Sequence, residues 1–188
     1  EETGRYLHLA LLARAVNGEG FGQSVGRMAV EDGVTLPKKA ELETQLRDEP
    51  GHPLSPARAD LLQAMQQHNL AEGSHEISHK WKSSCVLGNA FGHKVPYTVH
   101  PGIGYDIISN HPMFNGAALG RAAELDFATF GGAVEGLDGG VVPAVGCLLN
   151  PSDAADALTR AGCVCRCRTT TNTRSTRYIS LYLHLIFL

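Results

Sequence analysis

Between residues 79 and 146 the sequence alternates helical and strand-like patterns, and this order restricts the possible folds more than any other property of the chain. A helical pattern ends near Gly92, and the β-branched run VPYTVH follows it at once. A long helical pattern begins at Asn115-Gly116, and DGGVVPAVG then predicts a second strand. Such an alternation predicts an α/β fold, a Rossmann-like parallel sheet with flanking helices, over residues 71–161.

The segments on either side of this predicted core differ from it and from each other. Residues 1–70 predict a helical N-terminal segment of four helices, the last two beginning after Thr35 and at Ser55-Pro56. Residues 162–188 contain CVCRCR, a threonine-rich tract and a closing apolar run, without the cysteine spacing of zinc sites. We expect this tail to be a non-native continuation of the domain or disordered, and we assign it no function.

Composition restricts the partners of the chain. Its 188 residues, 43% hydrophobic and 19% charged, have the balance of one soluble domain with a core. The net charge of −3 provides no basic field, so we expect no nucleic-acid partner. There is no apolar stretch of about 18 residues and no secretory signal, so we expect no membrane association and a cytoplasmic location. Five cysteines, an odd number, argue against a disulfide framework.

The loop that follows VPYTVH combines glycines with titratable side chains. In open α/β sheets ligands bind beyond the carboxyl ends of strands, where Gly102 and Gly104 would let the backbone approach a ligand. Asp106 could then bind a ribose hydroxyl, and His100 and His111 are the candidates for proton transfer because histidine titrates near neutral pH. The dinucleotide fingerprint is incomplete, since its third glycine is missing. Alternatively, the glycines only shape a turn and the histidines form ordinary hydrogen bonds.

The predicted helix start at Asn115-Gly116 suits a phosphate group. The first N–H groups of a helix lack intrahelical acceptors and lie at the positive end of its dipole, and Arg121 could add a bidentate contact. The small residues in the first turns would equally let the helix pack closely on a sheet. The sequence leaves both interpretations open.

The motif HExxH occupies residues 75–79. On a helix it would place two histidines one turn apart to hold Zn²⁺, with Glu76 as the base for a bound water. The preceding Gly73-Ser74 instead places the motif at a predicted helix cap, with its histidines in solvent. A zinc-dependent hydrolase is therefore an alternative, not the first hypothesis.

The run VPYTVHPGIGYDII, followed after a helix by DGGVV, resembles the deoxyhypusine synthase family and its deoxyhypusine-synthase-like relatives. The resemblance covers less than half of the chain. It implies a Rossmann-like fold that binds NAD, with loop positions Gly102, Gly104 and Asp106 and strand positions Gly139 and Gly140. It also implies oligomers that share sites between subunits.

One departure from that family limits the function that the resemblance implies. The synthase transfers an aminobutyl group from spermidine to a protein lysine through a lysine late in its own chain, and here no lysine follows Lys94. We therefore predict a deoxyhypusine-synthase-like homo-oligomer that binds NAD or another nucleotide, with a reaction other than deoxyhypusine synthesis. A non-catalytic oligomeric binding module is the further alternative.

Overall fold

The computed structural model describes residues 2–103, 106–137, 139 and 141–143. The chain divides into two compact units, Glu1–Phe130 and Gly131–Leu188. All the helices and strands that precede α6 (Gly116–Glu135) belong to the first unit. In the second unit the described residues are the end of α6 and a few that follow it. None of the helices in the described ranges is both long and apolar enough to cross a bilayer.

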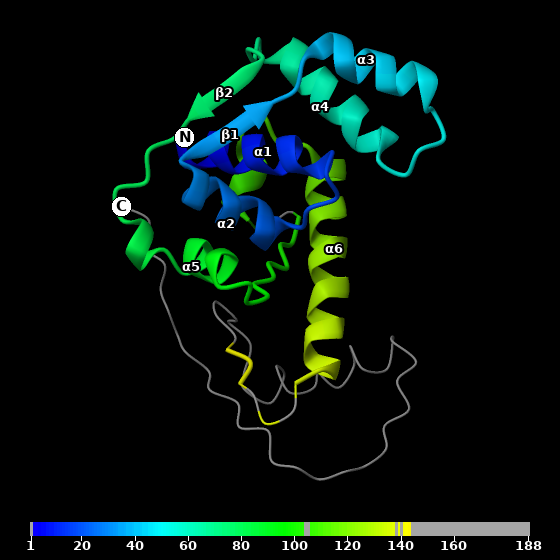
Figure 1. Cartoon of the computed structure of the whole chain (residues 1–188). Coiled ribbons are helices and arrows are strands. Elements are labelled where there is room, and N and C mark those ends of the chain that lie inside the picture. Colours follow the sequence, from blue (N-terminus) through cyan, green and yellow to red (C-terminus); the bar gives the residue numbers. More distant parts are fainter. Residues whose placement is uncertain (1, 104–105, 138, 140, 144–188) are drawn as a thin grey trace. The chain divides into compact units, whose positions relative to one another are not determined.

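Helix α1 (Glu2–Ala15) is the centre of the first unit (Figure 1). It is apolar around much of its circumference, as expected of a helix that other elements surround. One side of α1 packs with α2 (Phe21–Glu31), β1 (Gly33–Leu36) and α4 (Ser55–Gln67). The opposite side, through Leu11, contacts a second cluster that includes Leu119 and Ala122 of α6. The core therefore lies on two sides of α1, whose buried apolar residues are Leu9, Ala10, Leu11, Leu12, Ala13 and Ala15.

Two short strands, one after α2 and one after α4, pair with each other in the first unit. Helix α2 ends at Asp32, which has a left-handed backbone (φ 54°), and the chain turns directly into β1. Strand β1 pairs antiparallel with β2 (Gly73–Glu76), with Val34 opposite His75. The segment between the strands forms α3 (Lys39–Asp48) and α4, which pack on each other at one end of the unit (Figure 1).

The four predicted N-terminal helices are confirmed, and so is the start of α4 at Ser55-Pro56, whereas the predicted start after Thr35 is wrong. Thr35 lies within β1, and α3 begins at Lys39, whose N–H donates to the carboxylate of Glu72 over 2.8 Å. Ser55 is the first residue of α4, and its hydroxyl donates to the main-chain oxygen of Glu49 over 2.7 Å instead of capping the helix. The pairing of β1 with β2 was not predicted.

Helix α5 (Val86–Gly92) follows a 3-10 turn, η1 (Lys82–Ser84), and packs closely against α2. Gly26 of α2 makes this approach possible, and Gly22 lets the segment that follows α5 approach α2. A Cβ at Gly22 would lie 1.8 Å from the main-chain oxygen of Tyr97, and one at Gly26 would lie 2.6 Å from that of Leu87. The end of a helix near Gly92 was predicted and is confirmed.

The predicted Rossmann-like parallel sheet is wrong, because β1 and β2, the strands among the described residues, form an antiparallel pair. Residues 95–100, VPYTVH, form no strand, and Val95 is 58% exposed. β-branched residues favour a strand only where a neighbouring strand offers partners, and here the Val99 N–H donates to the carboxylate of Asp126. Of the second predicted strand, residues 139 and 141–143 are not in a strand, and the rest lie outside the described residues.

Asp126 of α6 connects three parts of the first unit. Its side chain is almost fully buried, and Oδ2 accepts the N–H groups of Gly22 at the start of α2 (2.9 Å) and of Val99 (2.7 Å). A Cβ at Gly20 would lie 1.9 Å from Asp126 Oδ1, so a glycine is needed beside the carboxylate. Burial raises the pKa of Asp126, whereas the bonds from Val99 and Gly22 and the nearby His100 oppose that shift. The negative charge also lies at the positive end of the α2 dipole.

Candidate functional site

A polar groove lies between α4 and the segment that leads into α6, and we call it the α4–α6 groove. Its volume is about 310 Å³. Residues 112–116 form one wall. The other wall follows a single helical stripe of α4 and the residue that caps its end, and these residues are Asp60, Gln63, Ala64, Gln67 and His68.

The start of α6 lines the groove through Asn115 and Gly116. Helix α6 begins at Gly116, as the sequence predicted, and both Asn115 and Gly116 line the groove. The side-chain oxygen of Asn115 accepts the N–H of Ala118 over 2.8 Å, as a helix cap does. Other N–H groups of a first helical turn have no intrahelical acceptor, so this end of the groove favours a negatively charged group.

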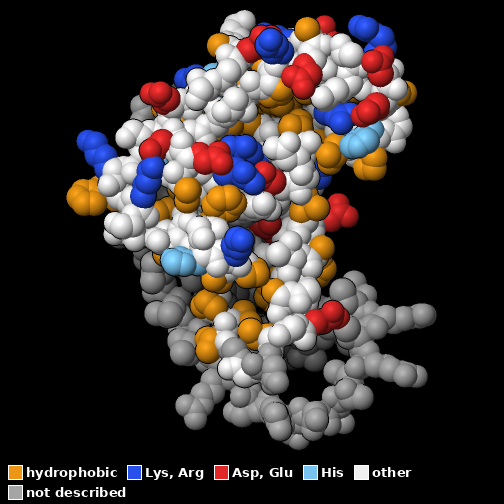
Figure 2. Space-filling model, viewed as in Figure 1, with side chains coloured by type: hydrophobic (Ala, Val, Ile, Leu, Met, Phe, Trp, Pro, Cys, Tyr) orange, Lys and Arg blue, Asp and Glu red, His pale blue; other side chains and the backbone are white. Residues whose placement is uncertain are grey.

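An ion pair holds α4 against α6 beside the groove. Arg121 donates to Asp60 Oδ2 over 3.0 Å, and both side chains are about four-fifths buried. The Arg121 charge therefore compensates the carboxylate that Asp60 contributes to the groove, and its Nη1 is buried without an acceptor among the described residues. Arg121 itself does not line the groove. Figure 2 shows acidic and basic side chains intermingled over the α3–α4 end of the visible face.

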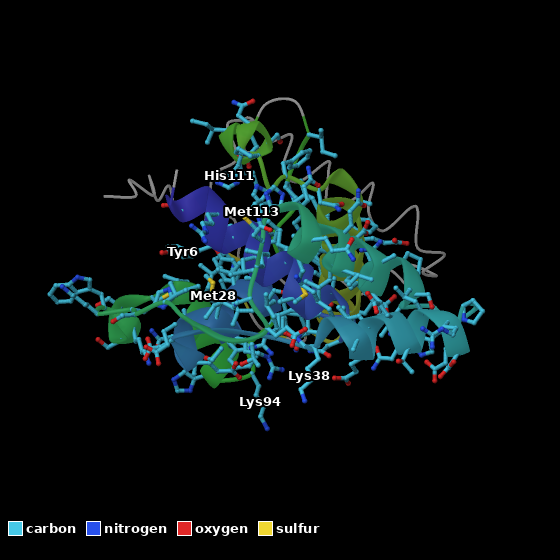
Figure 3. All side chains as sticks on the ribbon, turned by 90° about the horizontal axis from the view of Figure 1, so that it is seen from above. Tyr6, Met28, Lys38, Lys94, His111 and Met113 are labelled. Carbon is cyan, nitrogen blue, oxygen red and sulfur yellow. The ribbon has the colours of Figure 1, made fainter. Side chains whose placement is uncertain are left out.

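We call residues 111–116 the lip; residues 112–116 line the groove, and His111 precedes them without lining it. The Phe114 N–H donates to the main-chain oxygen of His111 over 2.9 Å, and the Met113 N–H donates to His111 Nδ1 over 3.1 Å. Met113 is buried in the core as well as lining the groove. Figure 3 shows His111 and Met113 near each other over α1. His111 thus fixes the course of the lip.

The ring of His111 packs against α1. A Cβ at Gly4 would lie 3.1 Å from the ring, and the ring of His8 lies beside it with 5.6 Å between centroids. His8 is 2% exposed, and its Nε2 lies 2.9 Å from the main-chain oxygen of Ile108 in η2 (Ile107–Asn110). Burial lowers the pKa of His8; the Ile108 carbonyl opposes that shift, His111 adds to it, and Asp106 opposes it more weakly.

His100, the other residue predicted for proton transfer, lies away from the groove lining. Its ring makes edge contacts with Phe127 and Phe130 at centroid distances of 6.3 and 5.6 Å, and its Nε2 lies 3.1 Å from the hydroxyl of Thr98. These contacts correspond to the ordinary side-chain interactions that the sequence left open as an alternative.

Asp106 and the predicted loop glycines that the structure describes do not line the groove either. Asp106 caps η2, its Oδ1 accepting the N–H of Ile108 over 3.1 Å, and neither Asp106 nor Gly102 lines the groove. Gly139 belongs to the second unit and has a φ of +70°. Two further glycines of the predicted site, Gly104 and Gly140, lie outside the described residues. Among the predicted ligand contacts, the groove contains Asn115 and Gly116.

The HExxH residues lack the helical geometry that the zinc interpretation requires. His75 and Glu76 lie in strand β2, and the chain up to His79 has no helical structure. Along an extended chain, residues four apart are separated by about 13 Å. His75 Nε2 lies 2.7 Å from the main-chain oxygen of Ala71, and the His79 N–H donates to Asp32. In the described part of the chain, no three histidine, cysteine or acidic side chains are grouped as metal ligands.

The α4 wall of the groove was not predicted from the sequence. Its side chains belong to no ligand-binding motif, although their spacing contains a usable signal. Polar residues at positions 60, 63, 67 and 68 share one helical face, whereas Leu61 and Met65 are buried. A polar stripe of this kind usually faces solvent, and it becomes a wall only because the lip runs beside it.

Comparison with protein-family models, with curated proteins and with solved structures finds no match for this chain. The resemblance to the deoxyhypusine synthase family therefore stays a prediction.

Proposed function

We propose that the α4–α6 groove binds a small phosphorylated ligand of the nucleotide class. The observation that carries the proposal is that the N-terminal turn of α6 and the polar stripe of α4 line the same groove. N–H groups at a helix start suit phosphate oxygens, and amide and carboxylate side chains suit sugar hydroxyls. The two walls thus offer complementary contacts to the two polar parts of a nucleotide.

The size of the groove favours one nucleoside phosphate. Its volume of about 310 Å³ is at the lower end of the range of ligand sites, about 300 to 1,000 Å³. A dinucleotide such as NAD would place one of its halves in the groove and extend the other beyond it. We therefore expect a mononucleotide to retain most of the affinity of NAD.

The charges around the groove are compatible with an anion. The carboxylate of Asp60 is compensated by Arg121, and the α6 dipole adds a partial positive charge at Asn115 and Gly116. The nucleotide class agrees with what the resemblance to deoxyhypusine synthases implies. The proposal includes neither their fold nor their reaction, and the homo-oligomer they imply can be checked by light scattering.

Calorimetric titration of the purified chain with NAD and with AMP tests the proposal. Gln67 lines the groove and its neighbour Gln66 does not, although both are exposed on α4. We expect Gln67→Glu to weaken binding of either nucleotide about tenfold, because it places a negative charge near the phosphate. The matched variant Gln66→Glu should change affinity by no more than about twofold.

Two results would contradict the proposal. If the folded chain gives no saturable heat with either NAD or AMP, the groove does not bind nucleotides. Equal losses in Gln66→Glu and Gln67→Glu would place the nucleotide somewhere other than the groove.

A further inference from the structure

His111 holds the lip through a bond that only its neutral ring can form. The Met113 N–H donates to His111 Nδ1 over 3.1 Å, so this ring nitrogen is an acceptor. A protonated imidazole carries hydrogen on both nitrogens and accepts no hydrogen bond. The bond from the Phe114 N–H ends on the main-chain oxygen of His111 and is independent of ring protonation. The link at Met113 is therefore the part of the lip that depends on pH.

The His111 ring is enclosed by a second histidine and by the backbone of α1. The buried ring of His8 lies beside it with 5.6 Å between centroids, and α1 at Gly4 closes another side. Burial lowers the pKa of His8, and His111 adds to that shift. The Ile108 carbonyl and, more weakly, the carboxylate of Asp106 oppose that shift.

We infer that His111 is a positioning residue, which when neutral holds the lip in its binding shape and when protonated releases the main chain at Met113. This inference rests on the proposed function, because Met113 lines the groove. Once the His111 ring is protonated, the Met113 N–H loses its acceptor and the lip loses the bond that fixes it. Ligand binding then weakens in acid.

The histidine in the groove itself predicts the opposite sign. His68 lines the groove, and a proton on His68 would attract a phosphate group and strengthen binding in acid. The direction of the pH dependence therefore separates the two histidines.

The experiment is a titration of the full chain with NAD, whose pyrophosphate keeps its charge between about pH 5.5 and 7.5. We expect binding to be about five-fold weaker at the lower pH, the effect of losing one hydrogen bond that holds the lip. In His111→Asn the amide oxygen replaces Nδ1 as acceptor and cannot be protonated, so affinity should match the wild type at the higher pH and stay constant. His111→Ala, without an acceptor, should bind weakly at both pH values.

A matched variant, His68→Gln, removes the histidine that lines the groove and should retain the weakening in acid. The inference would be overturned if the pH dependence of NAD affinity disappeared in His68→Gln and persisted in His111→Asn. So would equal affinities of His111→Ala and His111→Asn, which would mean that the acceptor at this position has no role.

Nuclear magnetic resonance separates failure of this inference from failure of the proposed function. The amide signal of Met113 should titrate together with the His111 ring in the wild type and stay fixed in His111→Asn, with no ligand present. A Met113 amide signal that does not change when the His111 ring is protonated would overturn the positioning role. A titrating amide in a chain that binds no NAD would support the positioning role and contradict the proposed ligand.

Discussion

Asp126 has two opposing effects on the stability of the first unit. Its Oδ2 accepts two main-chain N–H groups that would otherwise be left without acceptors near the core. Burial at the same time removes water from its charge, which raises the pKa of the carboxyl. Hydrogen bonding thus favours the presence of the side chain, and burial disfavours its charge. Substitutions can separate the two effects.

Replacing Asp126 with Asn keeps one oxygen in the place of Oδ2 and removes the charge. We expect Asp126→Asn to change the free energy of unfolding by no more than about 1 kcal/mol, whereas Asp126→Ala should lower it by about 2 to 4 kcal/mol because two N–H groups lose their acceptor. Urea unfolding of the three chains measures the difference. A loss in Asp126→Asn as large as in Asp126→Ala would mean that the charge, and not the acceptor, stabilises α2.

The raised pKa of Asp126 also predicts the sign of a pH effect. A carboxyl whose pKa is higher in the folded than in the unfolded chain binds protons more tightly when the chain is folded. Its contribution to stability therefore falls as the pH rises from 3.8, the ordinary pKa of the group, through the raised pKa of the folded chain. Relative to Asp126→Asn, the wild type should therefore gain stability as the pH falls through that window. Unfolding free energies of both chains, measured in parallel from neutral pH downward, would contradict this if their difference were constant.

At the scale of elements, the contact of α2 with α5 depends on a missing side chain. A methyl group at Gly26 would lie 2.6 Å from the Leu87 oxygen and 2.9 Å from Phe91 Cβ. Alanine is the better helix former by about 1 kcal/mol, yet here we expect Gly26→Ala to destabilise by about 1 to 3 kcal/mol because α5 has to move. Gly120 of α6 has open space around it, so Gly120→Ala should stabilise by about 0.5 to 1 kcal/mol. Thermal melting of both variants compares the two, and a stabilised Gly26→Ala would contradict the close packing.

Local patterns in the sequence predicted elements well and their partners badly. The helical segments before residue 70, the helix end near Gly92 and the start of α6 follow from apolar spacing and capping residues, which act over a few positions. Strand formation depends on a neighbour that no local pattern reveals. The β-branched run at 95–100 has no neighbouring strand in the described structure. Gly33–Leu36 and Gly73–Glu76 pair with each other although α3 and α4 lie between them in the sequence.

At the scale of the whole molecule, the sequence predicted part of one wall of the groove and missed the other. Asn115 and Gly116 follow from the rule for helix starts, but their partners on α4 are about fifty residues earlier and carry no motif. Their role depends on where α4 lies relative to the lip, which the Asp60–Arg121 ion pair helps to fix. A site formed between elements that are distant in sequence is a property of the packing, and periodicity alone does not reveal it.

The packing of the first unit also predicts how much of the chain it needs. The residues of its two core clusters lie between Tyr6 and Ala122, and Asp126 connects α6 to α2. A chain ending at residue 137, after α6, should therefore unfold cooperatively in urea with a free energy within about 1 kcal/mol of the full chain. A chain ending at residue 112 lacks Leu119, Ala122 and Asp126 and should show no cooperative transition. Circular dichroism follows both, and a chain of residues 1–137 without a transition would mean that residues beyond 137 belong to the folding unit.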